Sequence, residues 1–181
     1  MSALEGKKAA VLIADRFQDE EGIEPVAFLR EQGMEVTYIG LETGTVQGSD
    51  GRHEVEVTRT VSEADPDEYD LLLIPGGHAP EVLRLDETAL EFTRRFFEDT
   101  KPVASICHGA QVLISARVLP GRTVTCVPGI RDDVQLAGAR YVDRPVVVDR
   151  NLITSRIPED IPAMNEAILR ALVGETVEIP D

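Results

Sequence analysis

The chain has 181 residues, of which 43% are hydrophobic, and this length and composition suit one globular domain with a sizeable core. Its formal net charge is -15, from 33 acidic and 18 basic residues, and only 4% of its residues are aromatic, with no Trp. Such a surface repels phosphate groups and offers few rings for base stacking, which argues against nucleic acid and anionic membranes as partners.

The sequence also indicates a compartment. The longest apolar runs, at residues 9–14 and 71–75, are far too short to span a bilayer. The first eight residues lack the apolar segment of a secretory signal. Two cysteines without such a signal favour a reducing compartment over a disulfide scaffold, so we expect a cytoplasmic protein.

The amino-terminal part begins with a continuously apolar run that predicts a buried strand at residues 8–14. An acidic loop holding Glu21 follows, and then a helix that ends at Gly33. Pro25 is expected in the first turn of this helix, because proline is tolerated there and not in a helix interior.

A strand at residues 35–39 comes next, followed by a turn-rich stretch. Asp50-Gly51 and the alternating residues 54–57 predict a small β-hairpin outside the main sheet. Residues 62–69 are expected to form an acidic connector with a helical turn.

The second half continues the alternation of strands and helices. Residues 70–74 predict a buried strand, and Asp86 is expected to cap a helix that reaches about Asp99. The apolar stripe of this helix is assigned to Leu85, Ala89, Phe92 and Phe96.

The remaining elements are expected as a strand at 103–106, a helix from 110, a strand at 122–127 holding Cys126, a short helix at 130–137, strands at 146–149 and 152–155, and a final helix at 161–173. This alternation predicts an α/β fold, with a mostly parallel sheet covered by helices on both faces. We expect a single domain over residues 1–181, with its core at about 8–174.

Cys107 is the strongest candidate for a functional residue. It follows the predicted strand at 103–106 and precedes the helix from 110, with only His108 and Gly109 between them. So tight a reversal exposes the residue at its apex at the carboxyl end of the sheet, beside helix-start amides that stabilise a thiolate or an oxyanion. A buried Cys that merely ends a strand is the alternative interpretation.

Two other loops converge on the same edge of the sheet, because active sites of such folds lie beyond the carboxyl ends of the strands. One loop holds Glu21, and the other contains Gly76, Gly77 and His78. We favour His108 over His78 as the base on proximity, while His53 is assigned to the surface. The amides of Gly77 and His108 are candidate oxyanion donors.

Glu21 would affect the thiol in opposite ways in its two states. An ionised carboxylate would raise the pKa of the cysteine, whereas a protonated one could donate a hydrogen bond and lower it. Ser155-Arg156 is a weaker candidate at the same edge, and Cys126 is assigned to the core.

Several other chemistries find no support in the sequence. It contains no Gly-rich dinucleotide motif, no P-loop and no Cys/His spacing for zinc, so no metal or cofactor is expected. The pattern Cys107-x-Gly109-x-Gln111 fits the elbow of class I glutamine amidotransferases, but no histidine follows His108 to complete their triad.

These motifs resemble the PfpI family of intracellular cysteine hydrolases, a branch of the class I glutamine amidotransferase-like superfamily. The similarity covers about residues 10–173, and it depends on residues 104–109, 73–81, 147–149 and 154–156. Ala110 stands where many members have Pro.

The resemblance implies a flavodoxin-like three-layer sandwich with Cys107 as nucleophile and His108 as its partner. It also implies that Glu21 contacts the thiol and that Glu81 is supplied by a neighbouring subunit of a homodimer, or of a hexamer built from dimers. Family members are described as peptidases, and relatives as deglycase- or glyoxalase-type enzymes acting on small aldehyde adducts, several of them linked to stress responses.

Two functions therefore compete. The first is a PfpI-type cysteine hydrolase acting on peptides or aldehyde adducts, and the sequence does not separate these substrates. The second is a thiol redox sensor or general stress protein with little catalysis, because an exposed low-pKa thiol oxidises readily. A chaperone function has little support, since no large apolar surface stripe is visible.

Overall fold

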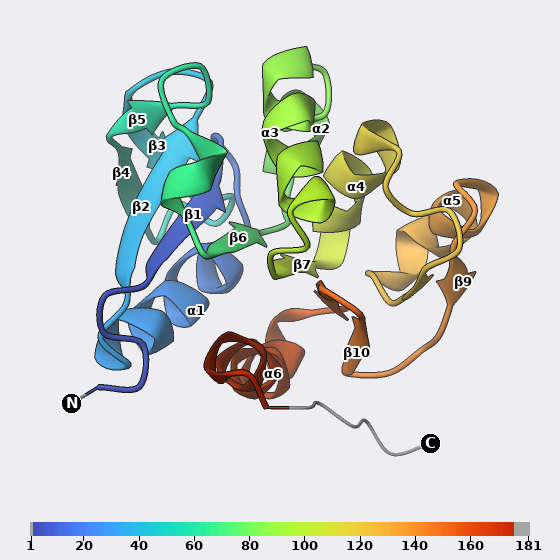
Figure 1. Cartoon of the computed structure of the whole chain (residues 1–181). Helices are drawn as coiled ribbons and strands as arrows, with labels where there is room; N and C mark the ends of the chain where they lie inside the picture. Colours follow the sequence, from blue (N-terminus) through green and yellow to red (C-terminus); the bar gives the residue numbers. More distant parts are fainter. Residues whose placement is uncertain (1, 176–181) are drawn as a thin grey trace.

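Seven strands form the central sheet of the computed structural model, which describes residues 2–175 (Figure 1). Their order is β10-β11-β7-β6-β1-β2-β5, and every neighbouring pair is parallel except β10 and β11. The strands are β1 (Lys8–Leu12), β2 (Glu35–Gly40), β5 (Arg59–Thr60), β6 (Leu71–Ile74), β7 (Val103–Ile106), β10 (Val146–Asp149) and β11 (Leu152–Ser155).

Helices cover both faces of this sheet (Figure 1). One layer holds α1 (Asp19–Glu31) and α6 (Ile161–Val173), and the other holds α2 (Ala79–Leu83), α3 (Glu87–Glu98) and α4 (Ala110–Ala116). Strands β1, β6 and β7 are almost entirely buried between the layers, which explains why their sequences are continuous apolar runs. The α/β fold predicted from the sequence is confirmed.

Smaller elements lie outside the main sheet. Strands β3 (Gly44–Gln47) and β4 (Glu54–Val57) form the predicted antiparallel hairpin, with Asp50-Gly51 in its loop. The others are the parallel pair β8 (Thr123–Val124) and β9 (Arg140–Tyr141), helix α5 (Arg131–Leu136), and the 3₁₀ turns at Pro66–Glu68, Cys107–Gly109, Pro128–Ile130 and Pro158–Asp160. Within residues 2–175, no helix has the length and apolar character needed to cross a bilayer.

Two expectations about helix α1 are wrong. The helix starts at Asp19, where the side chain of Gln18 caps it by accepting a hydrogen bond from the Glu21 N–H at 2.8 Å. Glu21 therefore lies in the first turn rather than on a loop, and Pro25 lies inside the helix. The sequence misplaces the start because glutamine is an uncommon cap and because proline is typical of a first turn.

Two further expectations fail in the second half. Only Thr123–Val124 of the expected strand at 122–127 is extended and paired, because the next amide, of Thr125, donates to the hydroxyl of Thr154. Leu85 is 85% exposed, since it precedes the Asp86 cap and is not part of helix α3. The remaining stripe residues Ala89, Phe92 and Phe96 are buried as predicted.

Candidate active site

The backbone at Cys107 makes a sharp strand-to-helix turn, of the kind that carries the nucleophile in many hydrolases. Strand β7 ends at Ile106, a 3₁₀ turn spans Cys107–Gly109, and helix α4 follows directly. Cys107 has φ 61°, a left-handed conformation that is uncommon for residues other than glycine and recurs at functional sites. Gly109 allows the turn to pack closely, because a Cβ there would lie 2.5 Å from the carbonyl oxygen of Ile74.

The thiol of Cys107 lies at the bottom of this turn and is largely screened from solvent, with the residue 9% exposed. Burial and the neighbouring Glu21 raise its pKa to about 12, although the amides of His108 and Gly77 act in the opposite direction. The sequence predicts an exposed Cys107 whose thiolate is stabilised by helix-start amides. The structure instead buries the thiol and keeps it protonated, since the cost of desolvation exceeds what two amides supply.

Glu21 is the buried acid of the site, with no exposed surface. One carboxyl oxygen, Oε1, accepts a hydrogen bond from the Gly76 N–H at 2.8 Å. Burial raises the pKa of Glu21 to about 8, so the carboxyl is protonated at neutral pH. Among the described residues, the other carboxyl oxygen, Oε2, has no hydrogen-bond partner apart from the adjoining Cys107 thiol. A protonated carboxyl can donate a hydrogen bond to this sulfur.

His108 is close enough to the sulfur to accept a proton from it. Its Nδ1 lies 3.5 Å from the Cys107 Sγ. Burial lowers the pKa of the imidazole, while the carboxylate of Glu81 opposes this shift and His78 adds to it. The ring is therefore neutral near pH 7 and available as a base.

The Gly76-Gly77 loop brings backbone amides to the sulfur. A Cβ on Gly76 would lie 2.6 Å from Glu21 Oε1 and 2.8 Å from the Cys107 Cβ, so the three residues meet at one point. Gly77 has φ 80°, and a Cβ there would overlap the backbone of residues 16–18. Phe17 pairs with Gly77 on one side and with Gly48 on the other, which joins the loop to the β3–β4 hairpin.

The structure thus brings Cys107, His108, Glu21, Gly76 and Gly77 together, with His78 and Glu81 close enough to act on the pKa of His108. Glu81 is an exposed residue in the first turn of helix α2. No cluster of His, Cys, Asp and Glu side chains in the described range, 2–175, could hold a metal ion.

The weaker candidates have other contacts. His53 lies 3.3 Å from the buried carboxylate of Asp19, and Cys126 is fully buried. Ser155 is buried, and Arg156 forms ion pairs with Asp143 and Asp160.

Asp19 is the residue that sequence reasoning missed. Its carboxylate is fully buried and accepts hydrogen bonds from the amides of Asp50, Arg52 and His53. It therefore fixes the loop of the β3–β4 hairpin next to the start of helix α1. Nothing in the local sequence distinguishes it from its solvated neighbours, because its partners are more than 30 positions away.

Comparison with known proteins agrees with this geometry. Residues 7–171 match the model of the DJ-1/PfpI family. Protein/nucleic acid deglycase 2 of Escherichia coli is 48% identical over 168 residues, covering 92% of this chain and 98% of that protein. Deglycase PfpI of Pyrococcus furiosus is 47% identical over 165 residues, covering 91% and 99%, respectively. General stress protein 18 of Bacillus subtilis is 46% identical over 169 residues, covering 92% and 98%.

Solved structures show the same fold. A two-domain protein from Anabaena variabilis, with a DJ-1/ThiJ/PfpI-like and a ferritin-like domain, superposes with a TM-score of 0.91 at 39% identity. The match covers 97% of this chain and 50% of that one. DJ-1beta of Drosophila melanogaster superposes with a TM-score of 0.85 at 27% identity, covering 93% of this chain and 91% of that one.

Proposed function

Because this chain belongs to the DJ-1/PfpI family, we propose that it is a cysteine-dependent hydrolase of the deglycase type, with Cys107 as its nucleophile. The observation that carries this proposal is the placement of a neutral imidazole 3.5 Å from a thiol at a strained strand-to-helix elbow. The names of the E. coli and P. furiosus relatives support a deglycase in particular. The substrates are amino or thiol groups modified by small aldehydes.

The buried thiol is protonated at rest, so the nucleophile forms when a substrate is bound. The Cys107 sulfur attacks the carbon of the adduct that carries the modified nitrogen. The C–S bond forms as the C–N bond breaks, and the thiol proton passes through Nδ1 of His108 to the departing amine. In the bound ketoaldehyde unit a proton then moves from the sulfur-bearing carbon to the neighbouring carbonyl carbon, which gives a thioester without an external oxidant, and the amides of Gly77 and His108 stabilise the oxygen that carries the negative charge. Water adds to the thioester, and cleavage of the C–S bond releases a hydroxy acid and restores the thiol.

Glu21 supports this step because it is neutral at physiological pH. A protonated carboxyl can donate a hydrogen bond to the sulfur as it gains negative charge, whereas an ionised one would repel that charge. The catalytic step therefore depends on a carboxyl group that the protein keeps protonated.

Two matched cysteine variants test the proposal. Cys107→Ala should lower the rate of release of methylglyoxal-modified amines by about a thousandfold, because the covalent step is lost. Cys126→Ala, the control, should keep the rate within about twofold, because none of the hydrogen bonds described at the thiol and the Glu21 carboxyl involves Cys126. Parallel assays on unmodified peptides identify a peptidase.

Undiminished release by Cys107→Ala would refute the nucleophilic role of this residue. The stress-protein alternative makes a different prediction, which follows from the name of the B. subtilis relative. In that case mild peroxide would oxidise Cys107 selectively while no substrate is turned over at all.

A further inference from the structure

The first turn of helix α1 carries two buried carboxyl groups that face different parts of the molecule. Glu21 accepts the Gly76 N–H beside the Cys107 sulfur, whereas Asp19 accepts hydrogen bonds from the β3–β4 hairpin. Residues two positions apart in a helix do not face the same way, which explains this division. The proposed reaction uses Glu21, but nothing in it accounts for the burial of a charged group at Asp19.

The Asp19 carboxylate fixes the loop of the hairpin. Its Oδ2 accepts a hydrogen bond from the Asp50 N–H at 2.8 Å, and its Oδ1 accepts one from the His53 N–H at 2.9 Å. Nδ1 of the His53 ring lies 3.3 Å from the same Oδ1. Burial tends to raise the pKa of Asp19, but these contacts lower it below its usual value, so the group is charged at neutral pH. A Cβ on Gly48 would lie 2.3 Å from the carboxylate, so the loop packs directly against it.

The hairpin in turn holds the short segment at residues 16–18, which precedes the helix. Ser49 donates its N–H to the carbonyl oxygen of Phe17, and Arg16 donates its N–H to that of Gln47, both at 2.7 Å. The Phe17 side chain is fully buried, which adds packing to these hydrogen bonds. Because the segment and the hairpin are joined at both points, a hairpin that shifts would take the segment with it.

The same segment supports the Gly76-Gly77 loop on its other side. The Gln18 N–H donates to the carbonyl oxygen of Gly76 at 3.1 Å, and the His78 N–H donates to that of Arg16 at 2.8 Å. A Cβ on Gly77 would lie 2.4 Å from the Gln18 nitrogen, so the two backbones are in direct contact. The contacts therefore run from the buried carboxylate through the hairpin and this segment to the amides at the sulfur.

We propose that Asp19 is a positioning residue, which holds the Gly77 N–H where it stabilises the negative charge that develops in the reaction. This inference rests on the proposed function. Its carboxylate donates nothing to the substrate and acts through the hairpin and residues 16–18 instead. Stabilisation by backbone amides depends on donors that are in place before the reaction starts, so a small displacement of the loop has a large effect on the rate.

A substitution that keeps the shape of Asp19 tests the proposal on the full chain. In Asp19→Asn an amide group replaces one of the two oxygens, and this group cannot accept a hydrogen bond from the loop. We expect kcat for the release of methylglyoxal-modified amines to fall by about tenfold, with KM within about twofold of the wild type. The reason is that stabilisation of the transition state is lost while substrate binding is kept.

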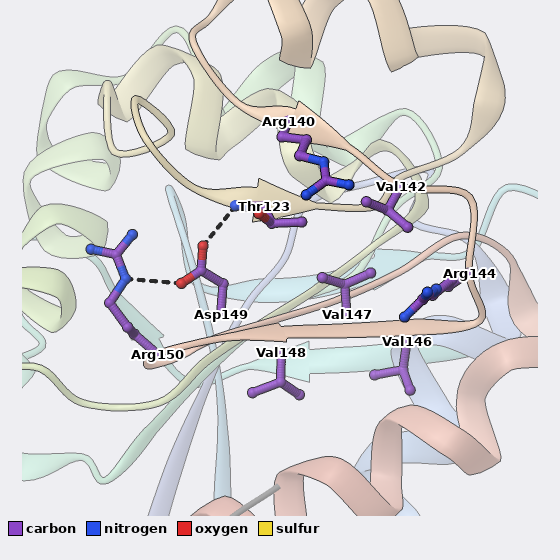
Figure 2. Close-up of a pocket in the computed structure, with 9 residues that line it drawn as sticks. All are labelled: Thr123, Arg140, Val142, Arg144, Val146, Val147, Val148, Asp149 and Arg150. Atoms are coloured by element: carbon purple, nitrogen blue, oxygen red, sulfur yellow. Dashed lines mark hydrogen bonds and ion pairs between the residues drawn. The ribbon is translucent and has the colours of Figure 1, made fainter. Parts of the chain in front are cut away.

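The control is Asp149→Asn. The Asp149 carboxylate also accepts a hydrogen bond from a backbone N–H, that of Thr123 at 2.6 Å (Figure 2). It lies toward the other end of the sheet, because its partner Leu152 is next to the first residue of β7, whereas Cys107 follows the last. Asp149→Asn should therefore lower the free energy of unfolding, as Asp19→Asn does, but leave kcat within about twofold of the wild type.

The titration of Glu21 provides a second measurement, which does not depend on turnover. Burial raises the pKa of Glu21 to about 8, although the Gly76 N–H opposes this effect. A loop that moves away from the carboxyl in Asp19→Asn should therefore raise this pKa further, by about 0.5 or more. Carbon-13 NMR of the Glu21 carboxyl measures the midpoint, which is independent of the amount of active protein. Asp149→Asn should leave the midpoint at its wild-type value.

The two measurements together decide the outcome. An unchanged Glu21 midpoint in Asp19→Asn would overturn the proposal, and so would equal losses of kcat in the two aspartate variants. If the wild type releases no modified amine, the proposed function fails, and the midpoint still decides whether Asp19 holds the loop.

A milder variant covers the case in which Asp19→Asn does not fold. His53→Ala removes only the contact between the exposed ring and the Asp19 carboxylate. It should change kcat and the Glu21 midpoint in the same directions by smaller amounts. A midpoint that stays at the wild-type value would then overturn the proposal.

Discussion

The Glu21 carboxyl and the Cys107 thiol are two acidic groups that share one buried position. Ionisation of Glu21 raises the pKa of the thiol, whereas the hydrogen bond of the neutral thiol partly opposes the effect of burial on the pKa of Glu21, so the two groups titrate as a coupled pair. Between them the carboxyl ionises first, with a pKa of about 8 against about 12 for the thiol. Below about pH 8 neither group carries a charge in the resting protein, so we expect the proposed reaction to be faster there than at higher pH.

The raised pKa of Glu21 predicts how stability changes with pH. Between about pH 4.5 and 8 the folded protein holds a proton that the unfolded chain has released. The resulting stabilisation is fully present below pH 4.5 and is lost as the pH rises through 8, with a slope on the order of 1 kcal/mol per pH unit. Glu21→Gln, which cannot ionise, should lack this slope.

Urea unfolding of both proteins at pH 5.5 and pH 8 measures the effect. The free energy of unfolding of the wild type should fall, relative to Glu21→Gln, between these two conditions. Parallel curves for the two proteins would show that Glu21 is already ionised at pH 5.5, and the role assigned to its proton would fail.

Gly76 offers a steric test of the same site. Gly76→Ala would bring a Cβ to 2.6 Å from Glu21 Oε1 and 3.0 Å from the His108 nitrogen, so the loop must move away from the sulfur. We expect kcat/KM to fall by about tenfold or more and the free energy of unfolding by about 1–3 kcal/mol. Gly129→Ala is the matched control, because nothing lies within 4 Å of the Cβ that it adds. Equal activity of the two variants would contradict the assigned geometry.

At the level of elements, local capping signals predict well where a helix begins and ends. Bounds that depend on contacts between residues far apart in the sequence could not be predicted. The Asp86 cap and the bounds of the final helix at 161–173 follow from neighbouring residues alone. The place of Pro25 in α1 does not, because the helix begins earlier than expected, at an unusual Gln18 cap, and so places Pro25 in its interior. The expected strand at 122–127 is cut short by a hydroxyl 29 positions away.

The Asp86 cap makes a prediction for helix α3. Its carboxylate accepts a hydrogen bond from the Ala89 N–H at 2.9 Å, so Asp86→Ala should lower the free energy of unfolding by about 1 kcal/mol. Asp99→Ala, at the opposite end of the same helix, should have no such cost, because a negative charge is not favoured there. Thermal unfolding of both variants compares them, and equal losses would refute the capping role.

At the level of the whole molecule, the alternation of strands and helices is sufficient to predict the layers and the edge at which the site lies. It also brings the Glu21, Gly76-Gly77 and Cys107 segments together. The electrostatic state of the thiol could not be predicted, because it depends on burial, which a single sequence does not report. The hydrogen bonds from the β3–β4 hairpin to Asp19 could not be predicted either, because the donors are more than 30 positions away.

We propose that the homodimer implied by the family resemblance forms through the exposed part of helix α2 and the adjoining Leu85. Val82 and Leu85 are exposed beside Glu81, by 50% and 85%, respectively. We expect size-exclusion chromatography to show a dimer, and Leu85→Asp to shift the protein toward the monomer, because apolar surface would otherwise be buried in the interface. An unchanged elution volume for Leu85→Asp would place the interface elsewhere.

Complementation then tests whether Glu81 acts across subunits. Glu81→Gln and Cys107→Ala chains, each of low activity, are unfolded together and refolded as mixed dimers. Recovery of part of the wild-type activity would show that one chain supplies Glu81 to the other, as the family resemblance implies. No recovery would assign Glu81 to its own chain, where it already acts on the pKa of His108.

The left-handed backbone of Cys107 has an evolutionary consequence. Glycine adopts a φ of 61° with less strain than cysteine does. The strain at Cys107, together with the burial of its thiol beside an acid, lowers the free energy of unfolding. If Cys107 is the proposed nucleophile, the protein accepts a lower stability at this position in return for its reactivity. A relative that has lost the proposed activity would then be expected to gain stability by replacing this cysteine.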